Sequence, residues 1–426
     1  MSVNEKKPIV FTDNTLPVIN KTKIRLNNGL SIFFIEGREE ELLRLEFLFY
    51  AGSYYQAKKL TAALTASLIK EGTHTRNSGK ISEALDYYGV YANFEPQKDL
   101  VSITVFVLED YLEPVLEIIE DVIKNPSFPE HEIEITLNNI KQKFIVEQQK
   151  VMSIARMNFG KYLFGEGHPY GRILSVSDFD NLARADLVEF HKKHYVADNS
   201  FCIVSGILND NIIDLFQKHF GNNDWLGGSV IAKKDKKTEY PKPDRHFIYK
   251  ENALQSAVRI GKICPGITHP DYHKLMITNT ILGGYFGSRL MKKIRQEKAY
   301  TYGINSAIVS LLNESYFFIS SQIGVDFVDK AIDDIYMEIK KIRTQHVDKE
   351  ELTVVKNYLY GSFLRSFDGI INQAERIKEL IFYDLNENHF ENYLNTLNSI
   401  TVEDISLMAE KYLNENHMSQ LVVGKQ

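Results

Sequence analysis

Three runs in the first quarter of the chain carry the apolar pattern of β-strands. Residues 30–37 (LSIFFIEG) and 42–52 (LLRLEFLFYAG) are rich in apolar and aromatic side chains, and residues 100–108 (LVSITVFVL) alternate with period two. Such runs are typical of strands that bury at least one face. The sequence therefore predicts a sheet in this part of the protein.

Helical segments lie between and after these strands. Residues 59–70 (KLTAALTASLIK) form an apolar segment that a glycine ends, and residues 109–124 space apolar side chains at i, i+3 and i+4. A long helix is expected from Glu130 to Val151. Because strands and helices do not alternate strictly, the pattern favours an α+β fold, with helices on one face of a mixed, mainly antiparallel sheet.

A pattern near the middle of the chain recurs at its end. Residues 182–206 and 400–424 each contain a helix that ends at a tyrosine, an asparagine four residues later, and an apolar strand that ends at a glycine. The two copies lie about half the chain apart. This repeat indicates two homologous α+β halves joined by a linker.

The stretch between the halves differs in composition. Residues 227–244 combine glycine, a lysine cluster and two prolines, which is typical of a linker. We therefore predict an N-terminal domain over 1–226 and a C-terminal domain over 245–426.

Composition and charge argue against some classes of function. The chain has 426 residues, of which 44% are hydrophobic, and a formal net charge of -6, which argues against a general nucleic-acid surface. Its two cysteines, Cys202 and Cys264, stand in apolar contexts, as expected of buried thiols in a reducing compartment. Because no secretory signal or membrane-spanning run is evident, we expect a cytoplasmic protein that does not bind membranes.

Histidine spacing does not predict a metal site. His191 and His194 are three residues apart on a helix, but a zinc site needs a third ligand, and the flanking lysines predict a solvent-facing surface. The chain also has no P-loop, no dinucleotide fingerprint and no Gly-x-Ser-x-Gly motif.

The densest group of polar residues lies in residues 282–308. A glycine-rich turn precedes a cationic helix that contains Arg295, and Tyr302 follows at the start of the next strand. Together, arginine and tyrosine donors suit a peptide carbonyl or an oxyanion. From the residues alone, a surface arginine and a core tyrosine remain the simpler interpretation.

The order of motifs along the chain resembles the pitrilysin/insulinase peptidase family, and within it the two-domain subunits similar to mitochondrial processing peptidase. The resemblance is carried by YAGSYYQ, KEGT, NPSFP, FGEGHPYGR and GGYFGSRLMKKIRQEKAYTYG, over nearly the whole chain.

Active members of this family carry a His-x-x-Glu-His zinc motif on the helix before a KGT-like turn. Anchored on Gly72, that motif falls on Ala63, Ala66 and Ser67. The position of the third ligand falls on Gln142 or Lys143, with Glu147 about one turn out of register. The resemblance therefore implies no zinc in this chain, which is expected to be inactive alone.

The resemblance also implies a role beside a partner. In two-chain members one subunit supplies zinc, and the other supplies an arginine and a tyrosine that Arg295 and Tyr302 match. The implied function is a non-zinc subunit of a heteromeric peptidase, whose homologous partner carries zinc and whose substrate is a peptide. The resemblance also implies that the halves of the chain together form a half-shell, and that the two chains close around the substrate. Further substrate-binding residues implied by the resemblance are Gly283, Gly284, Gly287, Ala92 and Asn93.

Two alternatives stay open. One is a catalytically inactive peptidase homologue that acts as a peptide-binding or scaffold protein. In the absence of a partner, the chain could also form a homodimer.

Overall fold

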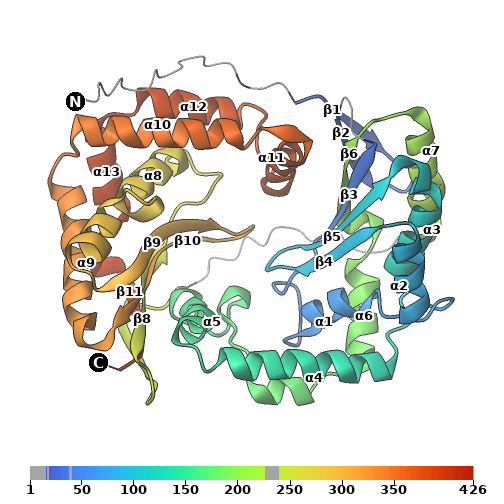
Figure 1. Ribbon diagram of the computed structural model, residues 1–426, viewed down its shortest axis with the longest axis horizontal. Helices are drawn as coiled ribbons and strands as arrows, with labels where there is room; N and C mark the ends of the chain where they lie inside the picture. The colour runs from blue at the N-terminus through green and yellow to red at the C-terminus, as the bar shows by residue number, and fades with distance from the viewer. Residues whose placement is uncertain (1–15, 17–18, 38–40, 226–238, 426) are drawn as a thin grey trace, which may run out of the picture.

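Two sheets form the centres of two halves (Figure 1). The computed structural model describes residues 16, 19–37, 41–225 and 239–425. The first sheet has six strands in the order β1-β2-β6-β3-β5-β4 and the second has five in the order β7-β11-β8-β10-β9. The strands are β1 (Lys21–Arg25), β2 (Ser31–Glu36), β3 (Leu42–Phe49), β4 (Tyr91–Pro96), β5 (Val101–Leu108), β6 (Ser200–Gly206), β7 (Arg245–Tyr249), β8 (Gln255–Ile263), β9 (Thr301–Ser310), β10 (Ser315–Gly324) and β11 (Ser419–Gly424).

Each half also contains helices, most of which cover the outer face of its sheet (Figure 1). In the first half they are α1 (Thr61–Leu68), α2 (Ser78–Tyr87), α3 (Leu112–Lys124), α4 (Glu130–Glu147), α5 (Val151–Phe164), α6 (Arg184–His194) and α7 (Asp210–Phe220). In the second half they are α8 (Tyr272–Asn279), α9 (Val328–Thr344), α10 (Lys349–Arg365), α11 (Gly369–Tyr383), α12 (His389–Ser399) and α13 (Val402–Tyr412), with the π-helical turns η6 (Thr280–Gly284) and η7 (Met291–Glu297).

The two halves share one topology. Strands β2, β3, β4, β5 and β6 correspond in order and pairing to β7, β8, β9, β10 and β11. In both halves the last of the corresponding strands in sequence, β6 or β11, lies between two others: it pairs in parallel with β2 or β7 and antiparallel with β3 or β8. Gly206 and Gly424 end the equivalent strands β6 and β11 with φ of 149° and 143°. The predicted α+β fold with two homologous halves is confirmed.

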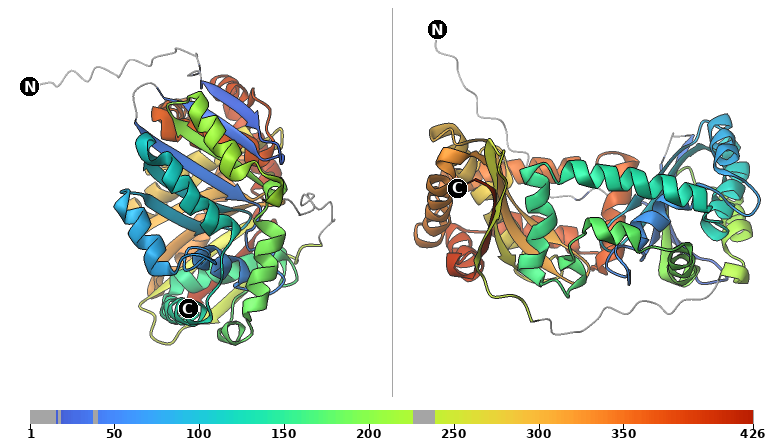
Figure 2. Two further views of the ribbon diagram at one scale, coloured as in Figure 1. Left: turned by 90° about the vertical axis from the view of Figure 1, so that its right-hand side faces the viewer. Right: turned by 90° about the horizontal axis from the view of Figure 1, so that it is seen from below.

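Each half also sends one helix onto the inner face of the other half's sheet. Phe159 and Leu163 of α5 pack against Ala257 and Leu421 of the second sheet. Helix α11 occupies the corresponding place on the first sheet, where it packs against β2 and β6. Figure 2 shows the resulting closed arrangement, in which α4 bridges the halves along one side. This exchange joins the halves through two separate apolar contacts.

The exchange depends on a break after α4. The predicted helix over 130–151 ends at Glu147, and a new helix, α5, begins at Val151 after a short turn. The turn redirects the chain from the first sheet to the second, so one predicted helix becomes a bridging helix and a packing helix.

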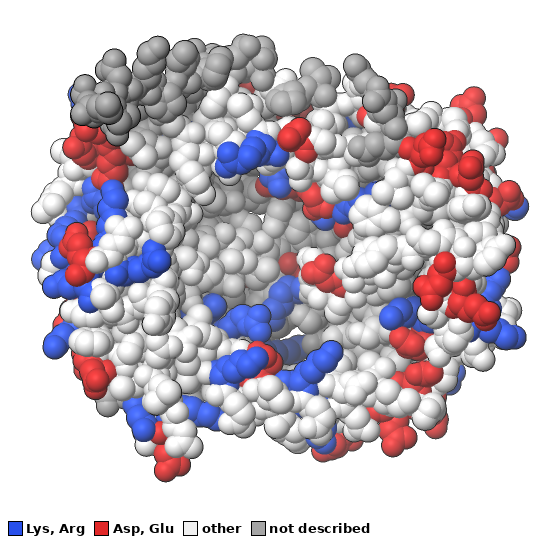
Figure 3. Space-filling model, in the orientation of Figure 1, with Lys and Arg blue, Asp and Glu red and all other residues white. Residues whose placement is uncertain are grey.

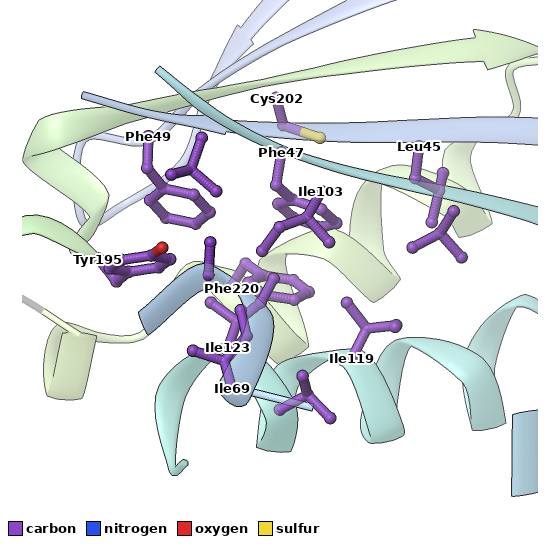
Figure 4. Close-up of a cluster of buried hydrophobic side chains, with 14 of the residues drawn as sticks. Leu45, Phe47, Phe49, Ile69, Ile103, Ile119, Ile123, Tyr195, Cys202 and Phe220 are labelled. Carbon is purple, nitrogen blue, oxygen red and sulfur yellow. The ribbon is translucent and has the colours of Figure 1, made fainter. Parts of the chain in front are cut away.

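The core of the first half lies between its sheet and the outer helices. Figure 4 shows Phe47 of β3 and Ile103 of β5 facing Ile119 and Ile123 of α3, with Phe220 of α7 between them. All of these side chains are buried. The packing fixes α1 and α3 beneath β4 and β5, and so positions the helix on which the zinc motif would stand.

The predicted linker lies mostly outside the described residues, which omit 226–238. Residues 239–244 have no regular secondary structure. Within the described ranges, no helix combines the length and the apolar character needed to cross a membrane.

Candidate functional site

Helix α1 presents the three zinc-motif positions without metal ligands. Ala63 and Ser67 are half-buried and Ala66 is fully buried, and the three lie on one face at i, i+3 and i+4. An alanine side chain offers no donor atom, and a neutral serine hydroxyl is a poor ligand for zinc. Throughout the part of the chain that the structure describes, no group of three or more His, Cys, Asp or Glu side chains could hold a metal ion. The residues of α1 therefore do not fit the family's zinc ion.

The turn after α1 is fixed by Asp121 of α3. Its carboxylate accepts hydrogen bonds from Thr73 at 2.6 Å and Thr75 at 2.7 Å, and pairs with Arg76 at 2.9 Å. Burial raises the pKa of Asp121, but these hydrogen bonds outweigh it and hold the pKa below its usual value. The Gly-Thr turn that aligns the chain with the zinc motif is therefore held in place although the ligands are absent.

The third-ligand region lies on α4, which packs against α1. Gln142 and Lys143 are exposed. Glu147, one turn away, accepts hydrogen bonds from Lys150 at 2.6 Å and from Ser153, and these bonds lower the pKa of its carboxyl group. Glu147 thus links the end of α4 to the first turn of α5 through side-chain hydrogen bonds.

The candidate substrate strand is the free edge of the first sheet. Among the described strands, β4 pairs with β5 alone, and α1 packs beside it. Asn93 is exposed and Ala92 is half-buried. An edge strand presents unpaired backbone groups that an extended peptide can join. The roles of Ala92 and Asn93 remain predictions.

Arg295 and Tyr302 stand on neighbouring elements of the second half. Tyr302 is the second residue of the edge strand β9 and is 91% exposed, so the core tyrosine that the residues alone suggest is wrong. The guanidinium of Arg295, on η7, lies 4.9 Å from the ring centre of Phe286, which is itself 66% exposed. Within the described ranges Arg295 makes no ion pair. Tyr302 thus lies exposed on an edge strand, and Arg295 lies half-buried on the π-helical turn that packs against that strand.

The glycine turn is shaped by close packing against β9. A Cβ atom on Gly283 would lie 2.5 Å from Ser306 Oγ and 2.8 Å from Ser306 N. On Gly287, a Cβ would meet the Tyr285 ring at 2.7 Å, whereas Gly284 has contacts of 3.3 Å or more. Gly283 is therefore required for η6 to approach the strand, and the substrate-binding role of all three glycines stays a prediction.

The histidines of α6 contradict the expected solvent-facing surface. His191 and His194 are 7% and 2% exposed. His191 Nε2 lies 2.8 Å from the Ile123 carbonyl oxygen and His194 Nδ1 lies 3.2 Å from that of Tyr50. Leu187 and Phe190 lie on the same face of α6 as the two histidines. The helical spacing of these apolar residues is therefore the sequence signal that predicts buried histidines.

Comparison with known proteins identifies the family and the fold. The family model described as insulinase (peptidase family M16) matches residues 41–167, and the model described as peptidase M16 inactive domain matches residues 181–359. Two solved structures share the fold. A peptidase M16 inactive domain from Pseudomonas fluorescens has a TM-score of 0.86 at 24% identity and covers 96% of this chain and 99% of its own. A protease from Helicobacter pylori has a TM-score of 0.83 at 18% identity over 95% of this chain and 100% of its own.

Relatives with and without peptidase names match over most of the chain. The uncharacterized zinc protease YmxG of Bacillus subtilis is 21% identical over 83% of this chain and 85% of its own. The non-peptidase homolog YmxG of Helicobacter pylori is 20% identical over 91% and 90%, and cytochrome b-c1 complex subunit 1 of Bos taurus is 25% identical over 84% and 77%. The chain therefore belongs to the M16 peptidase family, as an inactive homologue in which alanine and serine stand where the zinc ligands would be.

Proposed function

We propose that this protein is the non-zinc subunit of a heteromeric peptidase. A homologous partner would carry the His-x-x-Glu-His motif and its zinc, and this chain would contribute Arg295 and Tyr302. The observation that carries the proposal is the 91% exposure of Tyr302, on a strand that packs against the turn that carries Arg295, whose described contact is the exposed ring of Phe286. Neither position contributes to the core of this chain, which suits side chains that act on a ligand.

The two side chains have separate tasks in this proposal. The Tyr302 phenol would donate a hydrogen bond to the substrate carbonyl as negative charge develops on its oxygen. Arg295 would hold the peptide backbone through its planar set of donors. An extended peptide would pair with a free sheet edge, for which β4 with Ala92 and Asn93 is the candidate. Bond cleavage itself would belong to the partner chain.

The alternative is a peptide-binding or scaffold protein without peptidase activity. It is favoured by the likeness to cytochrome b-c1 complex subunit 1, which by name is part of a larger complex, and to a non-peptidase homolog. A cytoplasmic location is proposed for either function, because Cys202 and Cys264 are free and buried.

A peptidase assay separates the two functions. The chain is assayed alone, with a homologue that retains His-x-x-Glu-His, and as Arg295→Ala or Tyr302→Phe in that complex. We expect activity only in the complex and a loss of about 10²-fold for each variant, the magnitude of a lost oxyanion donor. Arg289→Ala is the control, because Arg289 is already paired with Glu351 at 2.7 Å. Activity of the metal-free isolated chain, or full activity of both variants, would overturn the proposal.

A further inference from the structure

Arg259, on the inner face of the second sheet, is a buried cation that has no carboxylate partner among the residues that the structure describes. It lies in β8 and is 9% exposed. Its Nε atom is buried and has no hydrogen-bond partner among the described residues. A buried guanidinium normally has a carboxylate partner, because removal of the charge from water is costly.

A second unsatisfied group lies directly opposite. Ser320 of β10 is the antiparallel partner of Arg259 in the sheet and is 4% exposed. Its Oγ atom also lacks a hydrogen-bond partner within the described ranges. Side chains that face each other across two strands lie close together on one face of the sheet. A guanidinium and a hydroxyl, both short of an acceptor, are therefore neighbours.

Aromatic rings hold the guanidinium in place. Its central carbon lies 4.9 Å from the ring centre of Phe318 on β10 and 5.9 Å from that of Phe159 on α5. Ring faces attract a cation and restrict its orientation, but they accept none of the hydrogen bonds that the edge of the guanidinium can donate. The orientation of the Arg259 guanidinium is thus restricted, while its Nε donor has no acceptor among the described residues.

The surroundings are cationic. Burial lowers the pKa of Arg259, and the positive charge of Arg156 on α5 adds to that shift, while Tyr316 opposes it. Arg156 is exposed. Figure 3 shows lysine and arginine side chains gathered along one side of the hollow between the halves. An anion entering this hollow would meet a favourable potential.

The row of polar side chains continues to the sheet edge. Asn305 of β9 pairs with Ser320 in the antiparallel register, is exposed, and lies on the same edge strand as Tyr302. On the other side Arg259 faces Leu421, so the polar row runs only toward β9. An extended chain crossing the β9 edge would thus pass Asn305 and place one of its side chains or its end near Ser320 and Arg259.

We propose that Arg259 and Ser320 bind a carboxylate group of an extended peptide, supplied either by an acidic side chain or by a free C-terminus. The Arg259 guanidinium would donate two hydrogen bonds to the carboxylate oxygens, and the Ser320 hydroxyl would donate a third. This site is separate from Arg295, and it requires neither zinc nor a partner chain.

The test is peptide binding by the full chain alone. Fluorescence anisotropy compares three labelled peptides of one extended sequence: one with an internal Glu and an amidated C-terminus, one with Gln and a free C-terminus, and one with Gln and an amidated C-terminus. The protein variants are Arg259→Gln and Ser320→Ala. The control is Arg343→Gln, which removes an arginine that is ion-paired with Glu415 and lies on the outer helix α9. Thermal unfolding of each variant is measured in parallel.

We expect the wild type to bind one or both carboxylate peptides about tenfold more tightly than the neutral peptide. Which of the two binds identifies the source of the carboxylate. Arg259→Gln should abolish the preference and Ser320→Ala should reduce it several-fold, whereas Arg343→Gln should keep it. Arg259→Gln should not lower the unfolding temperature, because it removes an unpaired buried charge.

Equal binding of all three peptides by the wild type would overturn the proposal, as would a full preference in folded Arg259→Gln. Displacement of the carboxylate peptide by an equal concentration of inorganic phosphate would also overturn it, because the site would then take a small free anion. If Arg259→Gln does not fold, the wild-type preference and its change in Ser320→Ala decide the question. None of these results depends on peptidase activity, so failure here leaves the proposed function intact.

Discussion

The Tyr170 hydroxyl donates a hydrogen bond to the Asp99 carboxylate, and together the two side chains bind the turn between β9 and β10. Asp99 accepts from Leu312 N at 3.1 Å and the Tyr170 hydroxyl accepts from Asn313 N at 3.4 Å. Both side chains are 4% exposed. A buried polar pair from the first half thus holds a turn of the second half.

Removal of the Tyr170 hydroxyl should weaken the contact between the halves. Tyr170→Phe leaves a buried carboxylate and a backbone amide with fewer partners, which costs about 1–3 kcal/mol of unfolding free energy. Urea denaturation measures the loss. Tyr162→Phe is the matched control, because the Tyr162 ring stacks on His246 and its hydroxyl has no hydrogen bond within the described ranges. Equal stability of the two variants would contradict the proposed contribution of the Asp99 contact.

Helix α11 is held to the first sheet by a buried ion network. Arg44 of β3 pairs with Glu46 at 2.8 Å and with Glu375 of α11 at 2.7 Å, and Lys378 of α11 pairs with Glu46 at 3.0 Å. The side chain of Glu46 is 2% exposed and that of Arg44 is 8% exposed. The network lies at the contact through which α11 reaches the other half.

Removal of Glu46 alone should destabilise the protein more than removal of both members of the buried pair, Arg44 and Glu46. Glu46→Leu leaves Arg44 buried with one partner fewer and should cost about 3–5 kcal/mol. The double variant Arg44→Met with Glu46→Leu should recover most of that loss, because Lys378 and Glu375 still pair at 2.5 Å. A double-mutant cycle in urea gives the coupling energy. Additive effects of the single changes would show that the pair is not coupled.

Acid should destabilise the protein through α6. Burial lowers the pKa of His191 and of His194 from 6.5 to about 4, so the native state holds fewer protons than the unfolded state between these values. Stability from these histidines is therefore complete above pH 6.5 and is lost as the pH falls toward 4. At pH 5 the lowered pKa of each histidine reduces the free energy of unfolding by about 2 kcal/mol.

Unfolding at pH 7 and pH 5 checks this expectation. His191→Gln should reduce the difference between the two pH values, since glutamine does not titrate. The exposed His417→Gln should leave the difference unchanged. A wild-type stability that is equal at both pH values would show that the two buried histidines do not govern acid sensitivity.

Local patterns predicted local structure well. The strands over residues 31–36 and 101–108 follow from apolar runs and period-two alternation, and the repeat before Gly206 and Gly424 anticipated the shared topology. The exchange of α5 and α11 could not be predicted in this way. It depends on which sheet each helix meets in space, and an apolar helix face does not specify its partner.

In the candidate sites, too, some residues could be predicted from the sequence and others could not. The empty zinc positions could be assigned because Gly72 fixes their register on one helix. In contrast, Arg259 and Ser320 are 61 residues apart and become neighbours only through the pairing of β8 with β10. Before that register is known, Arg259 is an isolated cation in an apolar strand, and Ser320 is one of two adjacent serines.

Restoring the zinc motif on α1 should not restore a zinc site. The variant Ala63→His, Ala66→Glu, Ser67→His places three large polar side chains on a helix where Ala66 has no exposed surface. Overpacking of this kind costs about 1–3 kcal/mol per site.

The third-ligand region still offers Gln142 and Lys143, and two histidines alone do not complete a tetrahedral site. We therefore expect a less stable protein with zinc affinity weaker than about 1 μM, far below that of structural zinc sites. Competition with a chromogenic chelator measures the affinity, and the variant with glutamine at all three positions controls for bulk. Tight, stoichiometric zinc binding by the histidine variant, and not by the glutamine variant, would contradict this expectation. It would show that the rest of the metal site is intact and that the inactivity of the chain is due to the residues of α1 alone.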